Sequence, residues 1–519
     1  MVFWALVALF VFVIYYANQY YFSYWKRLGV PQQDAPTFLL GDLAGIFSGK
    51  RKCFGETFFE FYNRFKHNKI YGLYFSYRPS LIVNDPEVIQ EVMIKDFTSF
   101  HDRGLFVDEK VDPLSAHLFF LGGQKWRDLR VKLSPMFTSG KLKAMYPIIQ
   151  DCAKQLHDYL LKNTQEKKSF DFDAKDLFAR FTINVISSVA FGIENDCIND
   201  PENIFHKMGV RIFERRPRDK IVRLLGFFVP KIVDKLKVKK YHPEIEDFFH
   251  SIVKQNIDLR EQGGSLAERK DFMQLLVQLK NQGYVTVDKS EEHEVDNATS
   301  TERRKLTFQE VASQVFVFFI GGFETSSSTM NYCMYELSKN PHVQKKLHEE
   351  LDNHLKSIDD LTYDTLSSMK YLDWCVDETL RKYPIVPMLN RESSRDHHFA
   401  GTNMKIEKGT PIIIPVLGIH RDPKIYDNPM EFRPERFANS SAGSPNVNGL
   451  CYMGFGDGPR SCIAARLGKL QTKIGLAAIL LKLKFELADQ SMMDKELEFD
   501  PHQFALTPKD TVMLRATVR

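Results

Sequence analysis

The apolar and polar positions of the chain follow a distinct pattern at its start. Residues 2–17 are apolar without interruption, and no charged residue precedes Lys26. The uncharged run over residues 2–25 is long enough to cross a bilayer, and its final Tyr and Trp residues suit the interface. A cleaved signal peptide is the alternative, but a basic start and a small-residue cleavage site are missing. We therefore predict a retained membrane anchor over residues 1–25, with the following chain in the cytosol because Lys26 and Arg27 lie on that side.

Beyond the anchor, the pattern predicts a short stiff segment and one large domain. Pro31 and Pro36 interrupt helix formation, so residues 26–40 are predicted to form a hinge, followed by a single domain over residues 41–519. Alternating aromatic and β-branched residues near 70–84 predict a hairpin, and residues 86–280 show mainly helical spacing. Residues 404–416 read as short strands separated by a Lys-Gly turn.

Two segments carry unusual polarity. Residues 223–240 join an apolar patch to a basic run, which fits a membrane-surface helix and an ordinary amphipathic helix equally well. Residues 287–305 are almost free of large apolar side chains and are predicted to form an exposed loop.

A long buried helix is predicted after residue 307. Thr307 and Glu310 form a capping-box pair, and the apolar segment behind them ends against Pro341. Within it, Gly321 and Gly322 each cost about 1 kcal/mol relative to Ala in a helix. Glu324 and Thr325 then place a carboxylate and a hydroxyl in an apolar setting. A weakened buried helix beside polar groups indicates a ligand or reaction site.

Charge and cysteine content narrow the function classes. A net charge of +4 from 70 basic and 66 acidic residues is too small to indicate a nucleic-acid partner. The seven cysteines are odd in number and contain no C-x-x-C pair, which argues against a disulfide framework or a zinc site and favours a reducing compartment; they are Cys53, Cys152, Cys197, Cys333, Cys375, Cys451 and Cys462. Glycosylation of the sequons at Asn297 or Asn439 would contradict a cytosolic location.

Three short motifs occur in the second half of the chain. In FGDGPRSCIA, residues 455–464, Gly, Pro and Arg surround Cys462, which fits either a surface turn or a loop that presents a thiolate to a metal. Glu378 and Arg381 share a helix face before Pro384 ends that helix. Arg436 lies in FRPERF, between aromatic and proline neighbours.

Five motifs in this order resemble the cytochrome P450 family of haem-thiolate monooxygenases, in its microsomal form. They are W-x-x-x-R at Trp126 and Arg130, G-x-E-T at Gly322, Glu324 and Thr325, E-x-x-R at Glu378 and Arg381, P-E-R-F at residues 434–437, and F-x-x-G-x-R-x-C at Phe455, Gly458, Arg460 and Cys462. Residues 100–146 are particularly similar to the insect members of the sixth numbered group.

The resemblance implies a mainly α fold with a small β region, preceded by one transmembrane helix. It implies haem b held between the central helix and the Cys462 loop, O2 as co-substrate, and NADPH electrons delivered by a reductase, with cytochrome b5 as an additional electron donor. The expected substrates are lipophilic small molecules such as xenobiotics, plant toxins, insecticides or hormones. The expected location is the endoplasmic reticulum membrane, with the catalytic domain facing the cytosol.

The resemblance also implies roles for individual residues. Cys462 would be the axial iron ligand, Phe455 would shield its sulfur, and Gly456 and Gly458 would let the backbone approach closely. The propionate contacts would be Trp126, Arg130, Arg391 and Arg460, although Arg391 could also be a surface cation.

Further roles concern proton delivery, stability and substrate binding. Glu324 and Thr325 would deliver protons during oxygen activation, and the weakened helix at Gly321 and Gly322 would open space for oxygen. Glu378, Arg381 and Arg436 would form a structural ion network under the loop. The expected substrate contacts are His117, Phe119, Phe120, Phe318, Val386, Met388, Leu389 and Phe504.

Two positions depart from the family pattern, and two alternatives remain at this point. Ala464 stands where the family usually has Gly, and Gly321 stands where it usually has Ala. The alternatives are a haem-thiolate isomerase or dehydratase, and a membrane-anchored haem-binding or lipophile-binding protein with impaired catalysis. Glu324 and Thr325 argue against the first, because an isomerase needs no delivered protons.

Overall fold

The computed structural model describes residues 1–519 apart from 35, 39, 45–51, 215–238, 264, 265, 267, 286–303, 401, 403 and 439–451. Residues 223–240, which fit either a membrane-surface helix or an ordinary amphipathic helix, and the predicted exposed loop over residues 287–305 therefore lie almost wholly outside the described residues. Asn297, Asn439 and Cys451 also lie outside them.

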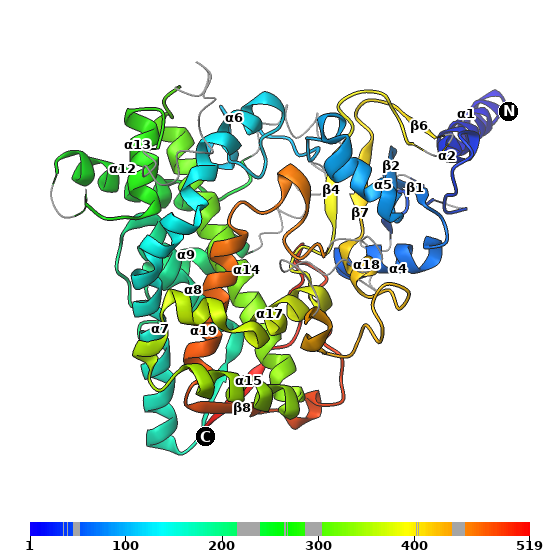
Figure 1. The fold of residues 1–519 in the computed structure, drawn as a ribbon. Coiled ribbons are helices and arrows are strands. Elements are labelled where there is room, and N and C mark those ends of the chain that lie inside the picture. Colours follow the sequence, from blue (N-terminus) through cyan, green and yellow to red (C-terminus); the bar gives the residue numbers. More distant parts are fainter. Residues whose placement is uncertain are drawn as a thin grey trace.

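The fold is mainly helical and is organised around one long central helix, α14 (Phe308–Lys339), which runs through the middle of the helical region (Figure 1). The Thr307 side chain caps its start, and Glu310 returns the bond in the predicted capping box. Helix α8 (Ala174–Phe191) packs along α14, as does α19 (Ala465–Leu480), while α7 (Ser139–Lys167) packs on α8 and α19. These helices enclose the main apolar core.

Other helices cover this centre and connect it to the sheets. They are α4 (Phe54–Phe65), α5 (Pro86–Gln90), α6 (Gly123–Leu133), α9 (Ile204–Phe213), α12 (Pro243–Glu261), α13 (Phe272–Asn281), α15 (Pro341–His354), α16 (Tyr363–Ser368), α17 (Lys370–Lys382) and α18 (Val416–His420). Helix α17 carries the E-x-x-R motif and ends just before Pro384, as predicted.

The β structure is small. The predicted hairpin is confirmed as β1 (Ile70–Phe75) antiparallel to β2 (Arg78–Val83). It belongs to a sheet with the order β1-β2-β7-β4, in which β7 (Pro411–Ile414) is parallel to β2 and antiparallel to β4 (Leu389–Glu392). A second sheet has the order β3-β9-β8, with β3 (Phe170–Asp173), β9 (Met513–Val518) and β8 (Leu483–Leu487); β5 (His397–His398) pairs with β6 (Lys405–Ile406).

The N-terminal helix α1 (Val2–Tyr21) projects from the β region (Figure 1). Its mean hydropathy reaches 1.8, and none of its residues is buried. Among the described residues, α1 is the one helix that is long and apolar enough to cross a membrane. The chain then continues into the short helix α2 (Tyr24–Arg27). Exposure of an apolar helix over its whole length makes α1 a candidate membrane anchor.

The junction after α1 is fixed to the sheet by specific contacts. Trp25 is fully buried, and its indole Nε1–H donates to the Leu73 carbonyl at 3.1 Å. Gly72 makes room for this ring, because a Cβ at that position would lie 2.1 Å from Trp25 Cγ. Residues 26–40, predicted as a hinge, also include Gln32, which pairs with Gly72 in a β-bridge. The anchor is thus joined to β1 through packed side chains.

Candidate active site

The loop before Cys462 is shaped by two glycines. Gly456 and Gly458 adopt φ of 76° and 66°, a region that L side chains rarely enter. At Gly458 a Cβ would also lie 2.0 Å from the Met93 carbonyl oxygen. The Cys462 N–H donates to the Phe455 carbonyl at 2.9 Å, which closes the loop immediately before α19. Only glycine satisfies both the backbone angle and the close approach at position 458.

Cys462 differs from the other described cysteines. Its side chain is exposed, whereas Cys53, Cys152, Cys197, Cys333 and Cys375 are buried. Although accessible, the sulfur lies deep in the fold, and this desolvation raises the pKa of the Cys462 thiol; the Ala464 N–H and the cations of Arg130 and Arg103 act in the opposite direction. An accessible sulfur beside fixed cations is the environment of a thiolate ligand.

Four arginines form one cluster, whose members Arg103 and Arg130 act electrostatically on this thiol; the cluster consists of Arg103, Arg130, Arg391 and Arg460. Arg130 Nη1 donates to the Ser461 carbonyl at 3.0 Å, and Arg103 Nη2 donates to the Arg460 carbonyl at 3.2 Å. Arg460 donates to the His101 carbonyl at 2.7 Å and to the Leu121 carbonyl at 2.8 Å. Most of these partners are neutral, so they hold the guanidinium groups without cancelling their charge.

Mutual repulsion within this arginine cluster perturbs its members. Burial, together with repulsion from Arg103 and Arg460, lowers the pKa of Arg391 to about 9. Burial, with repulsion from Arg103 and Arg130, likewise lowers the pKa of Arg460 to about 9, while the Asp102 carboxylate, whose oxygen lies 3.6 Å away, acts in the opposite direction. The Nε atoms of Arg391 and Arg103 are buried without a hydrogen-bond partner. The arginine cluster therefore has N–H donors that are free to bind an anionic ligand.

These residues fit haem b. Its two propionates would add carboxylates to a cluster of four arginines in which Asp102 lies 3.6 Å from Arg460, since guanidinium groups bind carboxylates in charge-assisted pairs. Trp126 lies in the same place, because its ring stacks under the Arg460 guanidinium with Cζ 3.9 Å from the ring centroid. Arg391 is only 1% exposed, so it is not a surface cation. The exposed Cys462 sulfur would supply the axial ligand.

The E-x-x-R residues form a second, closed arginine group. Arg381 makes two bonds to the Glu378 carboxylate, from Nε at 2.7 Å and Nη2 at 2.8 Å, and both side chains are fully buried. Arg436, from the short helix η8 (Pro434–Phe437), donates Nε to Glu378 Oε1 at 3.0 Å. Arg381 Nη1 also donates to the His420 carbonyl at 2.8 Å. The structure therefore contains the predicted ion network, which connects α17 to α18 through His420 and to η8 through Arg436.

Helix α14 carries a polar pair, Glu324 and Thr325, close in sequence to its contact with α19. Helix α19, which follows this loop, packs on α14 where Gln471 Nε2 donates to the Gly322 carbonyl at 3.4 Å. The Thr325 hydroxyl donates to the Gly321 carbonyl at 2.7 Å. The lone pairs of the Thr325 hydroxyl oxygen remain available to accept a hydrogen bond from a second group.

Glu324 has a partner that the motifs did not indicate. Lys175, at the start of α8, places Nζ 2.9 Å from Glu324 Oε1. The same ammonium donates to the hydroxyls of Ser327 at 3.0 Å and Ser328 at 2.7 Å. Lys175 lies 149 residues before Glu324, and its spacing alone would suggest a solvated helix position. Sequence reasoning missed this partner because no local signal identifies it.

The two glycines of α14 differ in their surroundings. A Cβ at Gly322 would lie 2.5 Å from Ile186 Cδ1, so Gly322 allows α14 and α8 to approach. A Cβ at Gly321 would meet no atom within 4 Å, and the helix is continuous through both residues. Gly321 is therefore the glycine on the open side of α14. Ala464 has φ of −98°, a conformation that alanine adopts without strain.

The expected substrate contacts are spread over several environments. His117 is 2% exposed with both ring nitrogens unpaired, and its ring packs on Phe120 and Phe316. Phe318 is packed between Phe137 and Phe272. Phe119 and Phe504 are exposed, Val386 is half-buried, and Met388 and Leu389 are buried on the sheet side. The structure does not gather all of these residues into one place.

The comparisons with known proteins agree with this geometry. Residues 36–515 match the family model "Cytochrome P450". The chain belongs to the cytochrome P450 family and is a P450 monooxygenase.

Curated relatives cover nearly the whole chain. It is 38% identical to a probable cytochrome P450 6a14 of Drosophila melanogaster over 98% of both chains. It is 39% identical to cytochrome P450 6a8 of the same species, over 98% of this chain and 97% of the relative. It is 36% identical to cytochrome P450 6d3 of Musca domestica, over 98% of this chain and 96% of the relative. The predicted similarity to insect proteins of the sixth group is confirmed.

Proposed function

We propose that this monooxygenase inserts one oxygen atom from O2 into lipophilic small molecules, using NADPH electrons from a reductase, with cytochrome b5 as an additional donor. The observation that carries the proposal is the accessible Cys462 thiol beside a cluster of four arginines, in which the Nε atoms of Arg103 and Arg391 are buried without a hydrogen-bond partner. Haem bound there supplies the oxygen-activating chemistry. The substrate class covers xenobiotics, plant toxins, insecticides and hormones, in keeping with the apolar, aromatic-rich surroundings of His117 and Phe120.

In this proposal the chain's own residues have separate tasks. The Cys462 thiolate would bind the iron. The propionates would be oriented by Trp126, Arg130, Arg391 and Arg460. Phe455 would shield the sulfur, and Gly456 would let the backbone approach it closely. On α14, the Thr325 hydroxyl passes protons, and Glu324 is the carboxylate that renews them, held at the α8 end by Lys175.

Replacement of Thr325 tests the proton-delivery role. Thr325→Ala removes the hydroxyl, so we expect NADPH consumption to continue while product formation falls, with several-fold more NADPH used per product. Thr325→Ser keeps the hydroxyl and is the matched control, which should retain coupling. Equal coupling in the Ala variant and the wild type would contradict the role of Thr325.

We further propose that α1 anchors the protein in the endoplasmic reticulum membrane with the catalytic domain in the cytosol. The exposed apolar surface of α1 and the basic residues just after it support this orientation. Protease treatment of sealed microsomes tests it: the domain should be digested without detergent. Protection of the domain, or glycosylation at Asn297 or Asn439, would contradict it.

A further inference from the structure

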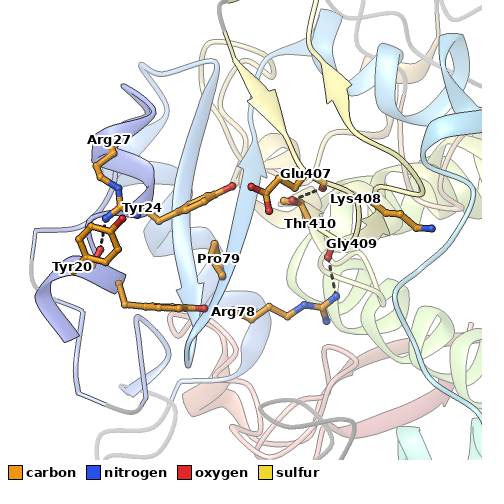
Figure 2. Close-up of a pocket in the computed structure, with 10 residues that line it drawn as sticks. Tyr20, Tyr24, Arg27, Arg78, Pro79, Glu407, Lys408, Gly409 and Thr410 are labelled. Atoms are coloured by element: carbon orange, nitrogen blue, oxygen red, sulfur yellow. Dashed lines mark hydrogen bonds between the residues drawn. The ribbon is translucent and has the colours of Figure 1, made fainter. Parts of the chain in front are cut away.

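A cavity of about 380 Å³ lies where the anchor meets the sheet, far along the chain from Cys462. Its walls come from the end of α1, from α2, from the start of β2, and from the β6–β7 loop. Figure 2 shows these segments converging around one space. The lining residues are Tyr20, Tyr21, Tyr24, Arg27, Arg78, Pro79, Glu407, Lys408, Gly409 and Thr410. The volume falls within the ordinary range for small-molecule sites.

Charges of both signs line this junction cavity without internal pairing. Within the described part of the chain, Arg27 and Glu407 have no ion-pair partner, and Lys408 has none either. Arg78 is committed, since it pairs with Glu392 and donates to the Gly409 carbonyl at 3.0 Å. Exposed single charges are usually just solvated. Here, however, an unpaired cation and an unpaired anion face the same concave space.

Aromatic rings separate the two charges. The Arg27 guanidinium stacks on Tyr20 with Cζ 4.0 Å from the ring centroid, and its Nη1 donates to Ser23 Oγ at 2.8 Å. These contacts fix the guanidinium at one end of the cavity. At the other end the Tyr24 side chain extends toward Glu407 (Figure 2). Burial, with a further contribution from Glu407, raises the pKa of Tyr24, which agrees with a carboxylate close to this ring.

This arrangement matches a ligand with one negative and one positive group. A fixed guanidinium binds phosphate through charge-assisted hydrogen bonds. A tyrosine face beside a carboxylate binds an ammonium group through cation–π and Coulomb attraction. The order along the cavity is therefore a phosphate site at Arg27 followed by an ammonium site at Tyr24 and Glu407.

The position of the cavity identifies the source of such a ligand. Tyr20 and Tyr21 are the last residues of α1, whose apolar side chains are exposed over its length. Tyrosines at the end of a spanning helix lie at headgroup depth. The contacts of Trp25 with β1 keep the β-sheet side of the cavity close to the end of α1, and so close to the headgroup level. The mouth of the cavity thus opens at the level where lipid headgroups lie.

We propose that the junction cavity binds the zwitterionic headgroup of a phospholipid from the bilayer that holds α1, with the phosphate on Arg27 and the ammonium group between Tyr24 and Glu407. The inference rests on the membrane anchorage under Proposed function and is independent of the chemistry at Cys462. A bound headgroup would fix the angle between anchor and domain.

Native mass spectrometry of the full-length chain from nonionic detergent tests the site. The probes are phosphatidylcholine, phosphatidic acid and diacylglycerol with identical acyl chains. We expect one phosphatidylcholine to be retained several-fold more tightly than the other two. Arg27→Gln should weaken binding of both phospholipids about tenfold, as expected for loss of a charge-assisted bond. Glu407→Gln should remove the preference for phosphatidylcholine over phosphatidic acid.

Lys26→Gln is the matched control, because Lys26 is adjacent to Arg27 but pairs with the exposed Asp34 and does not line the cavity. It should bind lipid as the wild type does. Equal retention of all three lipids, or a wild-type profile in both cavity variants, would overturn the inference. Flotation of the same protein with phosphatidylcholine vesicles separates the two claims: loss of flotation contradicts the anchor, whereas flotation without headgroup preference contradicts only the headgroup site.

Discussion

The protein contains two buried arginine groups that differ in how their charge is balanced. In the closed group, Glu378 accepts from Arg381 and Arg436, and backbone carbonyls take the remaining donors. In the open arginine cluster around Cys462, four guanidinium groups repel one another, and two Nε atoms are unpaired. The first arrangement is complete within the chain, and we propose that it is structural. The second has fewer carboxylates than cations, with Asp102 3.6 Å from Arg460, and we propose that it binds an external dianion.

Removal of the shared carboxylate in the closed group should have the largest effect. Glu378→Gln leaves two buried arginines without their counter-charge, and we expect a loss of about 3–5 kcal/mol in the free energy of unfolding. Urea denaturation of the haem-free chain measures this. Glu498→Gln is the control, because the Glu498–Lys509 pair is exposed to solvent and contributes little to stability. A similar stability for both variants would remove the distinction between the two groups.

Removal of a cation from the open cluster should leave the stability of the haem-free chain intact and weaken haem binding. Arg391→Met relieves repulsion from Arg103 and Arg460, so we expect the haem-free chain to be at least as stable as the wild type. Haem should dissociate roughly tenfold faster or more, because a charge-assisted pair with a propionate is lost. Transfer of haem to an excess acceptor protein measures the rate. Marked destabilisation without faster haem loss would mean that Arg391 is structural.

Acidification should affect the closed group through His420. The Met453 N–H donates to His420 Nε2 at 3.2 Å, so Nδ1 carries the proton and donates to the Arg381 carbonyl at 3.1 Å. Burial and repulsion from Arg381 lower the pKa of His420 to about 3. Between this pKa and the ordinary histidine pKa of about 6.5, the unfolded chain binds a proton at His420 and the folded chain does not. The contribution of His420 to the free energy of unfolding is therefore fully present above pH 6.5. It is lost as the pH falls toward 3, at up to about 1.4 kcal/mol per pH unit.

Denaturation midpoints at pH 7.0 and 5.5 check this expectation. His420→Gln should lose part of the pH dependence, while His117 still contributes, because burial lowers the pKa of His117 to about 3 as well. His398→Gln, at an exposed position, should leave the pH dependence as it is. If the pH dependence of stability is the same in the His420 variant and the wild type, this would contradict a neutral His420 imidazole held by two hydrogen bonds.

The sequence predicted the parts of the site whose determinants are local. The capping box at Thr307, the hairpin over β1 and β2, the helix before Pro384 and the glycine-shaped loop at Cys462 all depend on residues close in sequence. The partners of these elements could not be predicted in this way. Lys175 reaches Glu324, and Gly322 admits Ile186, only because α8 and α14 pack together.

The open cluster shows the same limit. Arg130 and Arg460 belong to motifs, but Arg103 has no motif and joins them through the Arg460 carbonyl 357 residues later in the chain. The junction cavity depends on α2 and the β6–β7 loop, which the sequence places almost 400 residues apart. Neither assembly has a pattern that a single sequence displays.

The most direct measurement is the carbon monoxide difference spectrum of the reduced, purified full-length chain, taken for the wild type and for Cys462→Ser. The wild type should bind haem and give the Soret band typical of thiolate ligation, and the serine variant should lose that band. A wild-type spectrum without the thiolate band, or the same band in both proteins, would contradict the assignment of Cys462 as the iron ligand.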